Sequence, residues 1–298
     1  MSVTEAEAPV RAIEAQINYL TADSHINRRW VAPGEEVNTG RFEPHRFTIR
    51  DGRSVRDRFT LDSHGFVLAD HKSAVTDFWD KEQVDAVYPG EVVEAVKALT
   101  GASFVAPMGW MVRTSGDMAQ FKRKDGPYTH QGGVQPPAGE AHVDMTPDRA
   151  ESMARMIYER ARPDGPGFKR FIASSFWRTF SPPPQDFPLA VCDGRSVGAE
   201  EGTPNTMFIV DKLPSAEDMV AEIPGEDKAI AAAIFRHNPA HRWWYFSNMT
   251  RDEAIMLKFH DSDGSVAWRT PHTAFHDPSF PGANVRESIE FRSVAFFE

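Results

Sequence analysis

The chain has 298 residues, near the upper limit for one hydrophobic core, so a single elaborated domain is the first expectation. A hydrophobic fraction of 41% and a charged fraction of 26% are those of a globular enzyme and exclude extensive disorder. The net charge of −10 argues against nucleic acid and anionic membranes as partners, because binding to phosphate groups requires the opposite sign.

The chain has one cysteine, Cys192, which excludes an intramolecular disulfide and a cysteine-rich zinc module. Residues 1–7 are acidic and lack the apolar stretch of a secretory signal. No run reaches the roughly 18–20 apolar residues that span a bilayer. We therefore expect a cytoplasmic protein without a membrane partner, and the sequence carries no signal for an oligomeric state.

Segments rich in aromatic and β-branched residues predict strands throughout the chain, with turn-forming residues between them. The predicted strands are residues 46–50, 103–113, 170–180, 206–210, 243–247, 254–260, 266–270 and 288–297. Several short strands with few helices indicate a β-sandwich or jelly roll, whose open end can bind a ligand between the sheets.

Helical patterns are fewer. Residues 84–99 carry apolar side chains near helical spacing, and Pro89 and Gly90 are expected to break or start that helix. Residues 147–162 are the clearer prediction, because Thr146 can cap the helix, Pro147 suits its first position and Pro163 ends it. Residues 252–257 could instead begin as a short helical turn.

His142 and Asp144 form the first candidate metal-binding pair. In an extended segment, residues two apart share a face, so the imidazole and the carboxylate can take adjacent positions on one metal. His-x-Asp also arises by chance, and a solvated ion pair is the simpler alternative.

A second histidine and an Arg-x-Ser pair near the C-terminus supply what a ferrous site with a bound 2-oxo acid needs. Two imidazoles and one carboxylate occupy one face of an octahedron and leave three positions for the 2-oxo acid and dioxygen. Arg286 suits the far carboxylate of the 2-oxo acid, and Ser288 on the same strand face can donate a further hydrogen bond. Either His272 or His276, fourteen and ten residues before Arg286, fits as the third ligand.

Two further arginines are candidates for binding an anion. Arg113 is predicted either to point into the barrel as a second anion partner or to form a surface ion pair. Arg292 shares a strand face with Arg286, so it either pairs with Glu290 outside the site or replaces Arg286 in binding the cosubstrate.

The remaining polar and aromatic candidates have structural interpretations. Lys258 and His260 alternate with apolar neighbours, which predicts that both face solvent. Residues 243–246 are aromatic and are predicted to lie mainly in the core, with a substrate-pocket wall as the alternative.

Five segments resemble one enzyme family, in the order in which they stand here. They are residues 141–146, 176–178, 188–197, 244–254, and 271–275 with 286–292. Over roughly residues 105–298 the chain thereby resembles the non-haem iron oxygenase family that includes fungal gibberellin desaturase and oxygenases of cephamycin and meroterpenoid biosynthesis. The resemblance implies a double-stranded β-helix (jelly-roll) core, ferrous iron and, usually, 2-oxoglutarate.

The resemblance also implies roles for single residues. The histidine of the His-Thr-Ala-Phe run recurs in the family, which favours His272 over His276. The implied iron ligands are His142, Asp144 and His272, and the implied 2-oxoglutarate-binding residues are Arg286 and Ser288. Trp177, Arg178 and residues 193–196 also match and are interpreted as scaffold or pocket wall.

The expected fold is mainly β with flanking helices. One domain is expected over residues 1–298, in which residues 1–100 form a mixed α/β extension packed on a jelly-roll core of about residues 103–298.

The expected function is that of an Fe(II)- and 2-oxoglutarate-dependent dioxygenase. It would use dioxygen to oxidise an unactivated C–H bond of a small specialised metabolite, by hydroxylation, desaturation or oxidative cyclisation.

Three alternatives remain open. One is an iron-dependent oxidase without 2-oxoglutarate, in which Arg286 and Ser288 bind a substrate carboxylate. Another is a non-enzymatic jelly-roll ligand-binding module with structural histidines. A zinc hydrolase would also suit a His/His/Asp set, but it leaves the Arg-x-Ser pair without a task.

Overall fold

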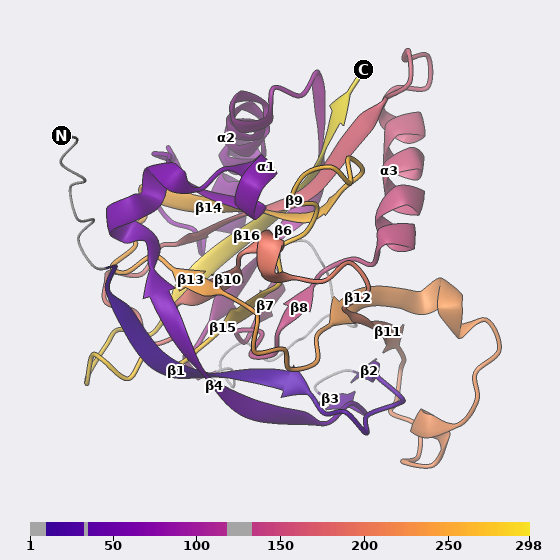
Figure 1. Ribbon diagram of the computed structural model, residues 1–298. Coiled ribbons are helices and arrows are strands. Elements are labelled where there is room, and N and C mark those ends of the chain that lie inside the picture. Colours follow the sequence, from indigo (N-terminus) through magenta and orange to yellow (C-terminus); the bar gives the residue numbers. More distant parts are fainter. Residues whose placement is uncertain (1–9, 33–34, 118–132) are drawn as a thin grey trace, which may run out of the picture.

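Two β-sheets, flanked by helices, form the architecture of the computed structural model, which describes residues 10–32, 35–117 and 133–298 (Figure 1). The ten-stranded sheet has the order β1 (Ala12–Leu20), β4 (Phe42–Asp51), β13 (Trp243–Tyr245), β10 (Leu189–Cys192), β15 (His272–Ala274), β8 (His142–Val143), β12 (Ile230–Ile234), β11 (Thr203–Ile209), β2 (Arg28–Ala32) and β3 (Glu35–Asn38). The six-stranded sheet has the order β5 (Phe66–Asp70), β14 (Glu253–Asp261), β9 (Arg170–Thr179), β16 (Glu287–Phe297), β6 (Phe104–Thr114) and β7 (Gly133–Gln135).

The helices flank these sheets. They are α1 (Leu61–His64), α2 (Lys81–Thr100) and α3 (Pro147–Ala161), with short 3-10 turns η1 (Gly52–Arg58), η3 (Gly194–Ser196), η4 (Asp218–Val220) and η5 (Glu226–Ala229). Helix α2 packs on β6 and β16, whereas α3 contacts β6, β9 and β14 (Figure 1). Within the described residues, no helix is long and apolar enough to cross a membrane.

The main core lies between the two sheets. One cluster of buried side chains includes Ile17 of β1 and Val191 of β10 from the larger sheet, together with Trp177 of β9 and Leu257 of β14 from the smaller one. The N-terminal part supplies strands to both sheets, because β1 to β4 extend the larger sheet and β5 extends the smaller one.

A second core lies under α2. Its buried residues Val84, Tyr88, Val92 and Val96 recur every four positions and form one apolar stripe. They pack with Phe291 and other residues of the six-stranded sheet. Strand β16 is therefore covered on both faces, and the face opposite Phe291 turns toward the space between the sheets.

Most predicted strands are confirmed, and seven of the eight segments overlap β4, β6, β9, β11, β13, β14 and β16. Residues 266–270 were predicted as a strand, but they form no strand. The segment makes isolated backbone bonds to β14, from Asp261 N to Trp268 O and from Thr270 N to Lys258 O, and does not form a continuous ladder.

The helix predictions have mixed outcomes. Helix α3 is confirmed, although the Thr146 side chain makes no capping hydrogen bond. Helix α2 runs through Pro89 and Gly90 without interruption, so the predicted break is wrong. The buried stripe holds the helix together at this point, and Asp80 and Gly101 cap its two ends. Residues 253–257 belong to β14, so the alternative of a helical turn there is also wrong.

Lys258 and His260 are buried, which contradicts their predicted exposure. Strand β14 pairs with β5 on one edge and β9 on the other, and every one of its residues is buried. The Lys258 ammonium donates to Asp261 Oδ2 at 2.6 Å and to the Ala267 carbonyl at 3.1 Å. His260 packs beside the rings of Phe171 and Trp268. A buried lysine needs such partners, and the alternating pattern of the sequence does not reveal them.

Candidate metal centre

Two adjacent strands of the ten-stranded sheet bring the candidate ligands together. His142 lies in β8, and Asp144 follows two residues later. Strand β15 pairs antiparallel with β8, and His272 stands directly opposite His142 in that register. The two imidazole rings consequently lie with centroids 4.4 Å apart.

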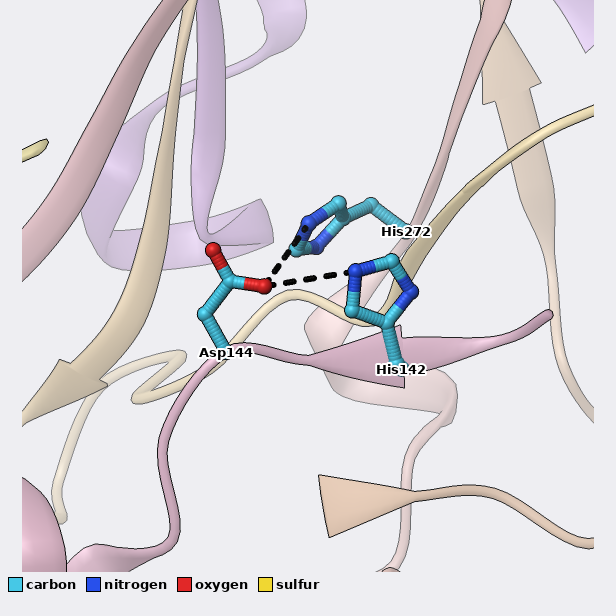
Figure 2. A group of neighbouring side chains, drawn as sticks. All are labelled: His142, Asp144 and His272. Carbon is cyan, nitrogen blue, oxygen red and sulfur yellow. Dashed lines mark ion pairs between the residues drawn. The ribbon is translucent and has the colours of Figure 1, made fainter. Parts of the chain in front are cut away.

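The three side chains converge on one point (Figure 2). His142 Nε2 lies 3.3 Å from Asp144 Oδ1, and His272 Nε2 lies 3.9 Å from the same oxygen. The potential ligand atoms all lie within 4.8 Å of one another, and this is the one such group of three or more metal-ligating side chains in the described ranges. The spacing fits a single ion bound by three ligands.

Backbone carbonyls fix both imidazoles. His142 Nδ1 donates to the Glu140 carbonyl at 2.8 Å, and His272 Nδ1 donates to the Thr270 carbonyl at 3.1 Å. A carbonyl oxygen only accepts, so each proton sits on Nδ1 and each Nε2 presents a lone pair toward Asp144. Such outer contacts orient histidine ligands in metal proteins. The donor set therefore fits a divalent iron, which binds imidazole and carboxylate.

Burial and charge favour the deprotonated form of two of the three donors, His272 and Asp144, as metal binding requires. Burial, together with the neighbouring His142, lowers the pKa of His272 to about 4. Burial opposes ionisation of Asp144, but the nearby Arg292 guanidinium and the two imidazoles hold its pKa well below the usual value. Burial would lower the pKa of His142, but interaction with Asp144 outweighs it and the pKa is raised.

His276, the other candidate third ligand, is not part of this cluster. It is exposed in the segment after β15, and its ring lies 5.4 Å from that of Phe187. The strand β15 ends at Ala274, and its pairing with β8 is at His272, so residue 276 lies beyond the paired segment.

A narrow cavity beside the metal-binding group leads to Arg286. Both His142 and His272 line it, and so do Arg286 and the Trp177 ring. The Arg286 side chain is buried, and its Nη1 donates to the Phe187 carbonyl at 2.9 Å. Burial and the nearby Arg113 charge lower its pKa to about 9. An arginine so far removed from water needs a counter-charge.

Two buried polar atoms, one on Arg286 and one on Ser288, have no partner among the described residues. Arg286 Nε and Ser288 Oγ make no hydrogen bond with any residue that the structure describes. Ser288 is fully buried, and its position in β16 puts its side chain on the same face as that of Arg286. Buried polar groups are rarely left unpaired, and these two donors suit a ligand that accepts hydrogen bonds.

Arg292 belongs to the site, but at the metal-binding group. Its Nη2 lies 2.8 Å from Asp144 Oδ2 and 2.7 Å from Glu290 Oε1. Glu290 also accepts from Arg113 Nε at 2.8 Å. The predicted Arg292–Glu290 pair therefore exists inside the site, and Arg113 forms a buried ion pair, not a surface one.

Glu290 lies inside the site, although the sequence analysis considered it only as a partner of Arg292 outside the site. It is buried between Arg113 and Arg292, and their charges lower its pKa even though burial opposes ionisation. The sequence contains a pattern that indicates this position, because period-two spacing from Arg286 through Ser288 places Glu290 on the same inward face of β16.

A larger cavity, of about 390 Å³, opens onto the same group. His142, Asp144 and Arg292 lie in its wall, and Arg113 and Glu290 line both cavities. The metal-binding group thus has a small pocket on one side and a substrate-sized cavity on another. This volume falls in the range of roughly 300–1,000 Å³ typical of small-molecule sites.

Known proteins resemble this chain along most of its length. Residues 17–296 match a family profile described as "YDMC: Oxidoreductase/YMDC permease-like domain". The hydroxylase/desaturase efuI of Hormonema carpetanum is 33% identical over 84% of this chain and 83% of its own length. The hydroxylase/desaturase CTB9 of Cercospora beticola is 32% identical over 87% of this chain and 78% of its own.

A solved structure agrees with these relatives. The iron and alpha-ketoglutarate-dependent endoperoxidase NvfI has a TM-score of 0.75 and 25% identity, covering 96% of this chain and 98% of its own. The Fe(II)/2-oxoglutarate-dependent dioxygenase nvfI of Aspergillus novofumigatus is 27% identical over 89% of this chain and 87% of its own length.

These similarities confirm the predicted fold class, mainly β with flanking helices around a double-stranded β-helix. They also favour the enzyme over a non-enzymatic binding module. The chain is a member of the non-haem Fe(II)- and 2-oxoglutarate-dependent oxygenase family.

Proposed function

We propose that His142, Asp144 and His272 hold the ferrous ion, and that Arg286 and Ser288 bind the distal carboxylate of 2-oxoglutarate. The unpaired Arg286 Nε and Ser288 Oγ carry this proposal, because Arg286 lines the same cavity as the two histidines and Ser288 lies two residues later on the same face of the chain. A carboxylate placed there would accept from both atoms and neutralise the buried guanidinium. The narrow cavity has about 20 Å³ of free volume in this structure, so binding requires its wall to widen.

The proposed reaction is oxidation of an unactivated C–H bond in a small specialised metabolite, by hydroxylation, desaturation or oxidative cyclisation. Bound iron would supply oxygen activation, with electrons from oxidative decarboxylation of the 2-oxo acid. The chain's own residues would do the positioning: His142, Asp144 and His272 would hold the metal, and the larger cavity would place the C–H bond near His142 and Asp144. The relatives efuI and CTB9, each named a hydroxylase/desaturase, support this reaction class.

The alternative without 2-oxoglutarate makes a different use of Arg286 and Ser288, which would bind a substrate carboxylate. Formation of one succinate for each oxidised substrate is expected for the 2-oxoglutarate-dependent reaction and not for this alternative. The names of the relatives favour 2-oxoglutarate as the cosubstrate.

The direct experiment is anaerobic reconstitution with ferrous iron and 2-oxoglutarate, followed by visible absorption. A chelated 2-oxo acid is expected to give a weak charge-transfer band. His272→Ala should lose the band, whereas His276→Ala, the matched control, should keep it. A protein shown to bind iron but giving no band would contradict the cosubstrate assignment, and equal bands in both variants would contradict His272 as a ligand.

We also propose that residues 1–298 form one domain. This is supported by the shared core, in which Ile17 of β1 packs in the same cluster as Trp177 of β9. The cytoplasmic location stays a prediction from the sequence, and dioxygen and a small molecule are the proposed reaction partners.

A further inference from the structure

The larger cavity has an unusual wall. Five of the eleven methionines of the chain line it: Met108, Met111, Met145, Met153 and Met207. Methionine is unbranched and polarisable, so it adapts to irregular apolar shapes. Ile209, Ile230 and Ile234 add to the same wall. This part of the lining suits a bulky apolar skeleton.

The side chains that line the larger cavity carry an excess of positive charge, whereas the protein as a whole is negatively charged. The cavity is lined by five basic side chains, Arg29, Arg113, Arg149, Lys228 and Arg292, against three carboxylates, although the chain has a net charge of −10. Three of the basic groups are already committed within the protein. Arg29 pairs with Glu36, and the other two belong to the ion-pair chain around Glu290.

Arg149 and Lys228 are the two basic residues of the wall without such a partner in the described part of the chain. Both are exposed, and neither forms an ion pair with any residue in the described ranges. Arg149 lies one helical turn before Met153 on α3, so both side chains lie on the same side of that helix. Lys228 lies in η5, just before the β12 residues that line the wall.

The carboxylates of the wall do not cancel this excess. Asp144 faces the histidines and Arg292, and Glu290 faces Arg113 and Arg292. Glu140 is the remaining acid of the lining, and it can balance one of the two free cations. The exposed part of the cavity therefore keeps a positive excess, which favours an anionic group on the ligand.

We infer that the larger cavity binds an apolar metabolite that carries a carboxylate, with the skeleton against the methionines and the carboxylate bound by Arg149 and Lys228. This inference rests on the proposed function, because it identifies the cavity at the metal-binding group as the substrate site. The carboxylate is held at the exposed end, so the apolar part of the molecule is the part that faces His142 and Asp144.

The test uses three matched fluorescent probes: 1-pyrenebutyric acid, its methyl ester and 1-pyrenebutylamine. Each is titrated into the anaerobic protein loaded with ferrous iron and 2-oxoglutarate, and binding is followed by fluorescence emission. The acid is expected to bind more tightly than the ester, and the amine least. An Arg149→Gln/Lys228→Gln double variant should weaken acid binding about 3- to 10-fold and leave ester binding unchanged. The preference for the acid should decrease in high salt.

The matched control is Arg155→Gln/Lys169→Gln, which removes two exposed cations that do not line the cavity. It should leave all three affinities unchanged. Equal affinity for acid and ester, or an equal effect of the two double variants, overturns the carboxylate assignment. No binding by any probe overturns the apolar class. The charge-transfer band of the same sample is the separate readout, because its loss reports failure of the proposed function and not of this inference.

Discussion

Arg292 Nη2 forms an ion pair with Asp144 Oδ2 at 2.8 Å, while Oδ1 of the same carboxylate faces the two imidazoles. The guanidinium thus engages one oxygen and leaves the other for a metal. Glu290 holds Arg292 in this position at 2.7 Å and is itself held by Arg113. The orientation of one metal-binding carboxylate therefore depends on a chain of buried charges that reaches β6.

Arg292→Leu is expected to weaken metal binding about 10- to 100-fold, the usual cost of losing such an outer contact. Arg292→Lys keeps the charge and should recover part of the affinity. Titration with Co(II), followed by its visible ligand-field bands, measures binding without turnover. Unchanged affinity and spectrum in Arg292→Leu would show that Asp144 holds its orientation without the guanidinium.

Arg286→Gln is expected to weaken 2-oxoglutarate binding about 10- to 150-fold, because a hydrogen bond to a charged group contributes about 1.5–3 kcal/mol. Ser288→Ala removes a hydroxyl only and should have a smaller effect, about 2- to 10-fold. Titration of the charge-transfer band gives both dissociation constants. If Arg286→Gln bound 2-oxoglutarate as tightly as the parent protein, another cation would have to be the anion partner.

Gly90→Ala is expected to stabilise the protein by about 0.5–1 kcal/mol, because glycine inside a helix costs about that much relative to alanine. Nothing lies within 4 Å of a methyl group added at this position. Gly101→Ala is the matched control and is expected to destabilise the protein. Gly101 caps α2 with a φ of 73°, a conformation in which alanine is strained. Urea denaturation should show a higher free energy of unfolding for Gly90→Ala and a lower one for Gly101→Ala. Stabilisation by both variants would contradict the helix end at Gly101.

Asp261→Asn is expected to destabilise the protein by about 3–5 kcal/mol at neutral pH, because it removes the nearest and only buried carboxylate of the two that pair with the Lys258 ammonium. Burial acts to raise the pKa of Asp261, but hydrogen bonds from Arg170 and Lys258 outweigh it and lower the pKa. A carboxyl whose pKa is lower in the folded state contributes stability above its unfolded value of about 3.9, and loses it as pH falls through the folded value. Urea denaturation should show that the free energies of unfolding of the parent protein and of Asp261→Asn converge below pH 4. A difference between them that stays constant down to pH 2 would contradict this linkage.

The sequence predicts long strands better than the short ones that carry the site. Strands β6, β9 and β16 have ten or eleven residues and a clear composition signal. Strands β8 and β15 have two and three residues, too few for any periodicity. The expectation that His142 and Asp144 meet His272 came from motif chemistry and family resemblance, since no local pattern predicts that β8 pairs with β15.

Burial of charge was the least predictable feature. The alternation at Lys258 and His260 suggests one solvated face, but β9 and the segment after β14 contact both residues. Pro89 fails as a helix breaker for a similar reason, because long-range packing of Tyr88 and Val92 overrides local propensity. These outcomes depend on partners distant in sequence, which a single sequence does not specify.

The facing positions of His142 and His272 have a consequence for the assembly of the larger sheet. Displacing β15 by one residue against β8 would turn one imidazole to the opposite side of the sheet. Two strands this short share too few backbone bonds to prevent such a slip on their own. A divalent ion bound by both rings would join residues 130 positions apart in the sequence. Because a shifted register would lose one of these ligands, the ion would stabilise the correct pairing of β8 and β15 over shifted ones. Metal binding would then also favour correct strand alignment during folding.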